Sequence, residues 1–420
     1  MAHPSNTQPS PPFHGWRILT MATVCQFVAT GFTVFIFGLF IDPLAEALNT
    51  GRAQIGSGSA IFYIVMALSG PVLGIWVDRG KVKWILTAGA ILQAAGLALL
   101  SQVTTPIQAG LACLFFIAPG AAMLGMIPAT AMVIQWFERR RALAVGICVA
   151  GMSLGGFLSP PFVAWLISLL DWRSSLLILA TLIAVVVVPL TWFIAVAKPS
   201  DIGQHPDGKP LENNPEKTSS IPQVSLSFAQ LVLTREFWTI AFTMGLISYS
   251  GVCMSTYIIP FASEQGLDLQ YSAMMMSLVT GAAFIAKFVS GWLSDHFNIT
   301  HVVSAIAIGV SIAWLPMLML DGIWPMVISA ILAGFSTGSL TPAIASLISF
   351  HFGPNAYGRV QGAIGPVSLI FLVLPGPVGG YLFDLNGSYK DVFATLWWLL
   401  PVAFAVSLTV PRKSRLAPTV

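Results

Sequence analysis

Long apolar runs alternate with short polar or charged breaks along almost the whole chain. The first six runs cover residues 16–41, 55–77, 83–103, 107–136, 141–168 and 174–197. The next six cover residues 237–262, 271–293, 300–320, 323–350, 358–383 and 390–410. Each run is long enough to cross a bilayer, because a spanning helix needs about 20 mostly apolar residues. The pattern predicts an all-α membrane protein with about twelve transmembrane helices.

Composition excludes several classes of protein. The chain is 56% hydrophobic and only 8% charged, whereas a soluble domain carries about 25% charged residues. A water-soluble enzyme is therefore excluded, and the surface must face membrane lipid. Lys and Arg number 19 against 16 Asp and Glu, a balance that gives no reason to expect a nucleic-acid partner. All four cysteines lie in apolar runs without metal-ligand spacing, so we expect neither a metal nor a cofactor.

One long polar stretch divides the chain. It predicts an N-terminal six-helix half at 1–197, a cytoplasmic linker at 198–235 and a C-terminal six-helix half at 236–420. Nearly all Lys and Arg residues lie on the side that carries the termini, and the other side holds Arg52, Arg173 and Lys390. The positive-inside rule places both termini in the cytoplasm. The compact loops favour a multi-pass protein of a bacterial inner (plasma) membrane, and we expect a monomer.

The two halves contain matching motifs at matching positions. Gly74–Lys81 reads GIWVDRGK after the second run, and Gly291–Asn298 reads GWLSDHFN after the eighth. Parallel repeats of this kind indicate a duplicated transporter with a substrate site between the halves. The first motif resembles the loop signature of the major facilitator superfamily. That resemblance implies gating or structural roles for Asp78, Arg79 and Asp295, without substrate contact.

A closer resemblance is to the monocarboxylate transporter branch and its bacterial relatives, which include oxalate/formate antiporters. It rests on Gly15–Arg17, on Trp136–Gly146 with its three arginines, and on Lys198–Gly208. The similarity extends over nearly the whole chain. It implies two pseudo-symmetric halves that alternate in access to the two sides, and it places Arg140 among the gating or structural residues.

Lys287 is the one charged residue near the middle of an apolar run. It precedes Asp295 by eight residues, or about 12 Å along a helix. A lone cation at this depth costs about 2.5–3.5 kcal/mol even on insertion scales, and no apolar run has an acid near its middle. An anionic substrate is the simplest partner. The alternative is that Lys287 bonds only to carbonyls and hydroxyls.

The number of cations narrows the substrate class. In the resembling families this position is an arginine that binds a carboxylate, and oxalate carriers have a second cation in span eleven. No such second cation occurs here, which favours a monocarboxylate. The animal carriers also have a span-one lysine, which is missing here, and an acid where this chain has Ala283. Coupling to protons, through Lys287 or with the acid itself, therefore stays open.

Polar side chains at helical spacing supply weaker candidates for substrate binding: Gln26, Tyr63, Tyr249 and Tyr257. Each has a structural alternative, because such groups also bond to backbone or mark the membrane interface. No cluster of catalytic groups is found, so we expect no enzyme and no catalytic residue. The leading interpretation is a secondary transporter of a small organic monocarboxylate. An exporter of drugs and a non-transporting anion sensor remain alternatives.

Overall fold

The computed structural model describes residues 13–137, 141–208, 232–352 and 357–411, and within these ranges every regular element is helical. The N-terminal elements are α1 (Gly15–Gly31), α2 (Phe37–Ala47), α3 (Arg52–Asp78), α4 (Val82–Ser101), α5 (Pro106–Ala112), α6 (Ala118–Leu124), α7 (Met126–Trp136), α8 (Arg141–Leu169), α9 (Trp172–Leu182) and α10 (Val188–Ile194). The C-terminal elements are α12 (Arg235–Glu264), α13 (Leu269–His296), α14 (Ile299–Ala313), α15 (Leu315–Met319), α16 (Ile323–Phe352), α17 (Tyr357–Val373), α18 (Pro375–Asn386), α19 (Tyr389–Trp397) and α20 (Leu400–Ser407). Two short 3₁₀ helices, Pro199–Ile202 and Pro206–Gly208, lie between the sets.

The predicted spans reappear closely. In the described part of the chain, 11 helical segments are long and apolar enough to cross a membrane. Several are composite: α5 to α7 form one segment, as do α9 with α10 and α14 with α15. Their ends generally lie within a few residues of the predicted ends.

The remaining predicted span, 16–41, consists of two helices. It is broken between α1 and α2, where Phe32–Ile36 leaves the α-helical pattern and the amide of Phe35 donates to the carbonyl of Thr30. Three of these five residues are β-branched, which weakens helix formation. The Thr33 hydroxyl also donates to the carbonyl of Ala29, a bond that competes with regular turns.

Two other spans contain single π-helical turns, at Cys113–Ile117 and at Ile183–Val187. Both interrupt a segment without ending it, since α-helix continues on either side. Such wide turns occur often at functional sites, and the first of them borders a cavity described below.

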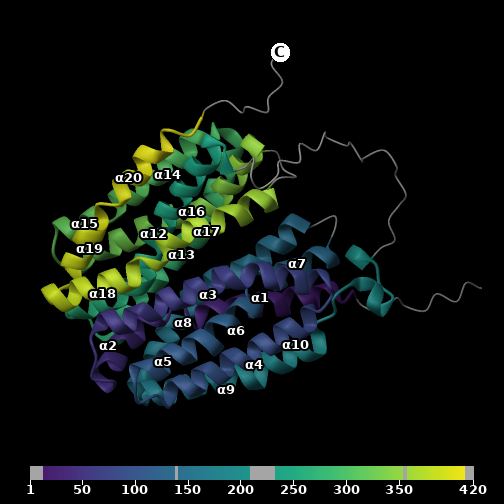
Figure 1. Ribbon diagram of the computed structural model, residues 1–420, viewed down its shortest axis with the longest axis horizontal. Helices are drawn as coiled ribbons and strands as arrows, with labels where there is room; N and C mark the ends of the chain where they lie inside the picture. The colour runs from purple at the N-terminus through teal and green to yellow at the C-terminus, as the bar shows by residue number, and fades with distance from the viewer. Residues whose placement is uncertain (1–12, 138–140, 209–231, 353–356, 412–420) are drawn as a thin grey trace, which may run out of the picture.

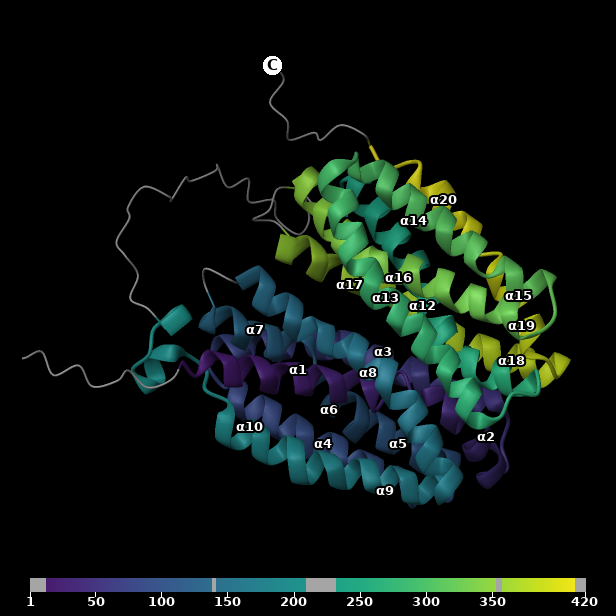
Figure 2. The same cartoon turned by 180° about the vertical axis from the view of Figure 1, so that it is seen from behind.

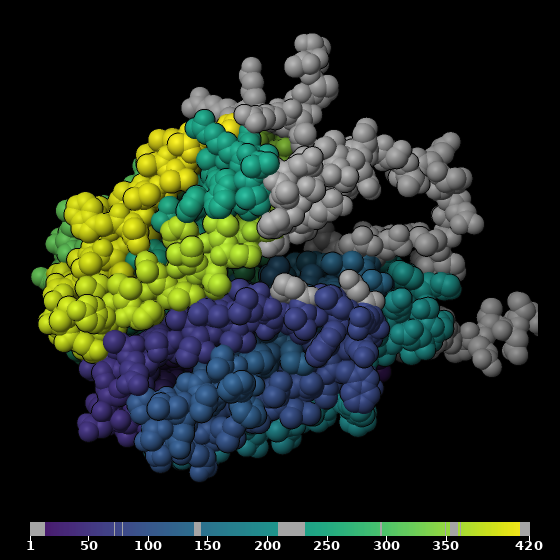
Figure 3. Space-filling model, viewed as in Figure 1, coloured from purple at the N-terminus to yellow at the C-terminus, as the bar shows by residue number. Residues whose placement is uncertain are grey.

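The elements form two helical groups side by side (Figures 1 and 2). Helices α1 to α10 make one group and α12 to α20 the other. The groups contact each other through α3 with α17 and α18, α8 with α13, and α2 with α12. Helix α12 lies deepest, with 72% of its apolar window buried, against 28% for the α9–α10 segment. Figure 3 shows α3 pressed against α17 and α18.

Candidate transport site and outer gate

The transport-site candidate lies where the two halves meet along α8 and α13. We call the end with Gly15 and Val410 the inner end, which is the predicted cytoplasmic side, and the opposite end the outer end. Lys287 of α13 is half-buried, and its Nζ donates to the Ser153 Oγ of α8 at 2.6 Å. Among the described residues, no carboxylate forms an ion pair with Lys287. The ammonium therefore has only a neutral partner here, and it keeps donors available for an anion.

On the outer side of Lys287, α8 and α13 pack closely. The Ser277 hydroxyl donates to the carbonyl of Phe157 at 2.6 Å, across the boundary between the halves. A methyl group added to Gly281 would lie 3.1 Å from the Phe157 ring. These contacts pack the two halves together on the outer side of the ammonium.

On the inner side, the same helices leave open space. A methyl group added at Gly146 of α8 or Gly291 of α13 would meet nothing within 4 Å. The same holds for Gly74 of α3 and Gly365 of α17. Lys287 thus lies between the outer packing zone and the inner stretch of both helices, where these glycines meet open space.

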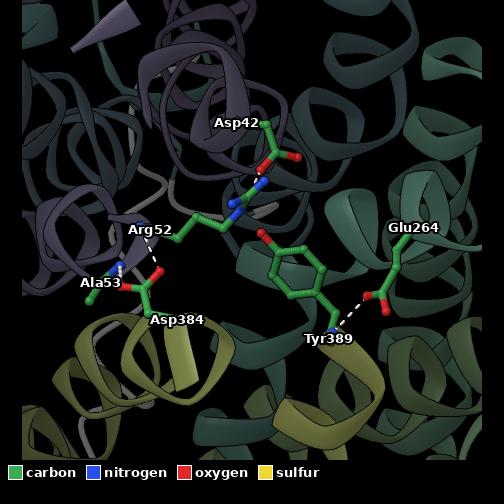
Figure 4. Close-up of polar contacts among 6 residues, drawn as sticks. All are labelled: Asp42, Arg52, Ala53, Glu264, Asp384 and Tyr389. Atoms are coloured by element: carbon green, nitrogen blue, oxygen red, sulfur yellow. Dashed lines mark hydrogen bonds and ion pairs between the residues drawn. The ribbon is translucent and has the colours of Figure 1, made fainter. Parts of the chain in front are cut away.

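The outer ends of α3 and α18 form a gate that joins the halves (Figure 4). Gly51 precedes α3 and supplies no capping side chain. The Asp384 carboxylate of α18 takes that role, accepting from the amides of Arg52 and Ala53 at 3.1 Å each. A methyl group at Gly51 would lie 2.6 Å from Asp384, so the glycine permits this approach. A negative charge near the first turn stabilises a helix, and here the opposite half supplies that charge through Asp384.

Further charged groups surround this cap. The Arg52 Nε donates to Asp42 of α2 at 2.6 Å, and its guanidinium lies 4.4 Å from the centre of the Phe383 ring. Glu264 accepts from the amide of Tyr389 at 2.6 Å, beside the same cluster (Figure 4). The gate therefore links α2 and α3 of one half with α18 of the other.

A surface ion pair lies at the outer loops of the C-terminal half. Lys390 donates to Asp321 at 2.6 Å, and this contact holds the pKa of the Asp321 carboxyl below its ordinary value. Both groups belong to the same half, so this pair does not connect the halves.

Closely packed glycines lie behind the gate. Gly56 of α3 meets Gly376 of α18, where an added methyl group would lie 2.5 Å from the opposite carbonyl. Gly380 packs against the backbone of Ala53. Small residues allow this close approach, and Gly376 and Gly380 of α18 therefore belong to the outer contact between the halves.

None of the four weaker binding candidates forms a hydrogen bond with Lys287 in the described part of the chain. Tyr249 and Tyr257 are fully buried, and their hydroxyls donate to carbonyls of the same half, those of Leu396 and of Pro375 and Gly376. Gln26 is also fully buried, close to Cys148. Tyr63 interacts with Ser255 of α12 across the halves. In this conformation none of the four has a recorded contact with Lys287, and their roles in binding stay predictions.

The gating residues suggested by resemblance are described only in part. Arg79 follows the end of α3 and is exposed. The side chains of Asp78 and Asp295, and the whole of Arg140, lie outside the described residues.

Sequence reasoning did not find Ser153, Asp42 or Asp384. Nothing in the sequence separates one membrane serine from many others. The helix that starts at Gly51–Arg52 has no capping side chain of its own, which indicates that another residue caps it, but the sequence does not indicate which one.

Comparison with known proteins supports this architecture. The Major Facilitator Superfamily model matches residues 23–377. Among curated proteins, monocarboxylate transporter 13 of Rattus norvegicus is 24% identical over 96% of this chain and 90% of its own length. Monocarboxylate transporter 12 of Homo sapiens is 24% identical, over 91% of this chain and 78% of its own length.

Solved structures share the fold. A bacterial homologue of the human lysosomal transporter Spinster, in an inward-facing and occupied conformation, aligns with a TM-score of 0.73 at 15% identity, over 96% of this chain and 98% of that one. The nucleoside transporter NupG gives a TM-score of 0.73 at 16% identity, over 94% and 99%. Since the family model spans most of the chain, the protein belongs to the Major Facilitator Superfamily of membrane transporters.

Proposed function

We propose that this transporter moves a small organic monocarboxylate by alternating access, with Lys287 as the group that attracts the carboxylate. The carrying observation is the half-buried ammonium at the opening between the halves, bonded only to the Ser153 hydroxyl in the described structure. An anion that replaces this neutral partner gains a charge-assisted hydrogen bond in a region of low dielectric. The monocarboxylate transporters among its relatives support the same substrate class.

Several finer features belong to this proposal. A single cation matches one carboxylate, which favours monocarboxylates over dicarboxylates. A proton can travel with the acid, so coupled symport fits the site without a dedicated carboxylate relay. We place the protein as a monomer in a plasma membrane, the bacterial inner membrane, with lipid around its apolar surface.

Uptake into proteoliposomes tests the proposal. Purified protein is reconstituted and given a panel of radiolabelled monocarboxylates, dicarboxylates and neutral solutes, with and without an imposed pH gradient. We expect saturable monocarboxylate uptake that Lys287→Ala reduces more than tenfold and that Lys287→Arg retains in part. Lys390→Ala, which removes a lysine of the outer surface, is the matched control and keeps near-normal uptake.

The opposite results would exclude the anion site. Normal uptake by Lys287→Ala, or uptake of neutral or cationic solutes alone, returns Lys287 to a structural role. Binding of the acid without accumulation would instead identify a sensor.

A further inference from the structure

A cavity lies toward the outer end of the molecule, mainly within the N-terminal half but reaching α12 of the other half. Its volume is about 230 Å³, and its walls come from α2, α3, α4, α5 and the segment that joins α1 to α2. Neither Lys287 nor Ser153 lines it. The cavity is therefore distinct from the Lys287–Ser153 site, although Tyr63, one of the weaker substrate-binding candidates, lies in its wall.

Two irregular points of the backbone border this cavity. One is the break at Phe32–Ile36, and the other is the π-helical turn at Cys113–Ile117. Non-helical backbone at membrane depth is tolerated where it is buried in protein or lines a cavity. Both irregularities thus occur where the chain forms walls around a space instead of packing helix against helix.

The lining specifies the chemistry of an occupant. Its rings come from Phe32, Phe37, Phe40, Phe62 and Tyr63, and it includes no Asp, Glu, Lys, Arg or His. An ionised ligand would pay a large desolvation penalty in such a site. An apolar cavity of about 150 Å³ can hold benzene, so this one has room for an aromatic ring with a second ring or a short substituent.

The few polar groups of the lining favour a ligand that carries a hydrogen-bond donor. The hydroxyls of Thr33, Ser57 and Ser59 donate to backbone carbonyls three or four residues earlier in the chain, at 2.5, 2.6 and 2.8 Å. Their hydrogens are used, but each oxygen can still accept. A ligand with one N–H or O–H group would find acceptors in the wall, whereas a ligand with only acceptors would depend on the Gln54 amide at the exposed edge of the cavity.

The cavity also reaches the boundary between the halves. Ser255 and Thr256 of α12 contribute to its wall, and Tyr63 interacts with Ser255. Residues 55–63 of α3 supply both cavity wall and the Gly56 and Ser59 contacts with α18. Opening the outer side would draw α3 away from α12 and α18 and take this wall apart.

We propose that this cavity binds an uncharged aromatic molecule of one or two rings with a single hydrogen-bond donor, and that the ligand holds the outer side closed. The exposed side chains of Ile107 and Gln54 lie at the cavity, so entry is from the outer membrane interface between α3 and α5. Because the wall includes both halves, a bound molecule favours the conformation in which they touch.

Binding of tritiated indole to purified protein, measured by scintillation proximity, tests this site without any transported substrate. Indole has one N–H donor, and indene has the same shape without it. Gly110 lines the cavity, and a methyl group added there would meet only Ile61, at 3.9 Å. The Cβ of Gly110→Leu therefore has room, and the rest of the leucine side chain is expected to occupy part of the cavity. Gly70→Leu, in α3 outside the cavity, is the matched control, since its added methyl group would meet only Ile127, at 3.6 Å.

We expect saturable indole binding that Gly110→Leu weakens at least tenfold and Gly70→Leu leaves within twofold, with all proteins equally heat-stable. Indene should compete at least tenfold less well than indole. Non-saturable partitioning alone, or equal binding by Gly110→Leu, overturns the site, and equal competition by indene overturns the donor requirement. Spin labels on Gln102→Cys and Gln265→Cys, at the outer ends of the two halves, test the effect on conformation. Indole should shift the distribution of distances between the two labels toward its shortest values. An unchanged distribution refutes the effect on the gate.

Discussion

At the scale of single residues, Lys287 and Ser153 carry the transport hypothesis. The Ser153 hydroxyl accepts from the ammonium at 2.6 Å without neutralising it. A carboxylate at position 153 would form an ion pair with Lys287 and compete with a substrate anion. We expect Ser153→Asp to raise the KM for a transported monocarboxylate at least tenfold, because the charge that attracts the substrate is already paired.

The matched variant is Ser153→Asn, because asparagine has nearly the size of aspartate but no charge. It should change the KM by less than threefold in the same proteoliposome assay. If Asp and Asn raise the KM equally, the effect is steric, and the electrostatic role of Lys287 is contradicted.

The pair also shows how far sequence reasoning reaches at this scale. Lys287 was identifiable because a midspan charge is rare and costly. Ser153 was not, because a membrane serine usually bonds to its own helix and only the packing of α8 on α13 reveals this one's partner. Tyr249 and Tyr257 matched a binding pattern, yet here their hydroxyls bond to backbone carbonyls within their own half. Spacing along a helix cannot say which face meets the other half.

At the scale of elements, we expect the cap that α18 supplies to α3 to control opening of the outer gate. Asp384 accepts from two amides of α3 and belongs to the opposite half. Loss of a capping side chain costs about 0.5–2 kcal/mol, or roughly 2- to 30-fold in an equilibrium constant. We expect Asp384→Ala to shift the protein toward the outer-open state by that amount, measured as longer distances between the Gln102→Cys and Gln265→Cys labels.

Asp268→Ala provides the comparison. Asp268 caps α13 by accepting from the amide of Tyr271 at 2.9 Å, wholly within one half. Its removal should lower heat stability with little change in the label distances. Equal shifts from the two variants would mean that Asp384 is an ordinary cap and not a gate.

Helix positions were more predictable than helix irregularities. Charges and prolines predicted most span ends closely, since a charged side chain in the bilayer core costs a large free energy. The break at Phe32–Ile36 and the π turn at Cys113–Ile117 depend on neighbouring helices and leave only weak local signals. No hydropathy pattern reports them.

At the scale of the whole molecule, the glycines show which side of the transporter is closed. Outer glycines such as Gly56 and Gly376 touch the opposite half, whereas Gly74 and Gly291 at the inner end meet nothing within 4 Å. The inner pair begins the repeated motifs of the two halves. In this conformation no neighbour requires a glycine at either position. Alternating access gives a reason for the small residues, because the inner ends must approach each other when the outer gate opens.

Gly291→Leu should therefore be accommodated in this conformation and obstruct the other. We expect unchanged heat stability, loss of long distances between the Gln102→Cys and Gln265→Cys labels, and at least tenfold slower transport. Val289→Leu enlarges an exposed position of the same helix and should leave all three unchanged. Wild-type transport by Gly291→Leu would contradict the alternation of inner and outer contacts.

Combining this variant with the gate variant tests whether the two ends are coupled. Asp384→Ala favours outer opening, while Gly291→Leu obstructs the inner closure that outer opening requires. If the halves move as rigid bodies, the double variant Asp384→Ala/Gly291→Leu should show the short label distances of Gly291→Leu, because a blocked inner end prevents the weakened outer end from opening. Long distances in the double variant would show that the ends open independently, and the halves would then have to bend instead of rocking around Lys287.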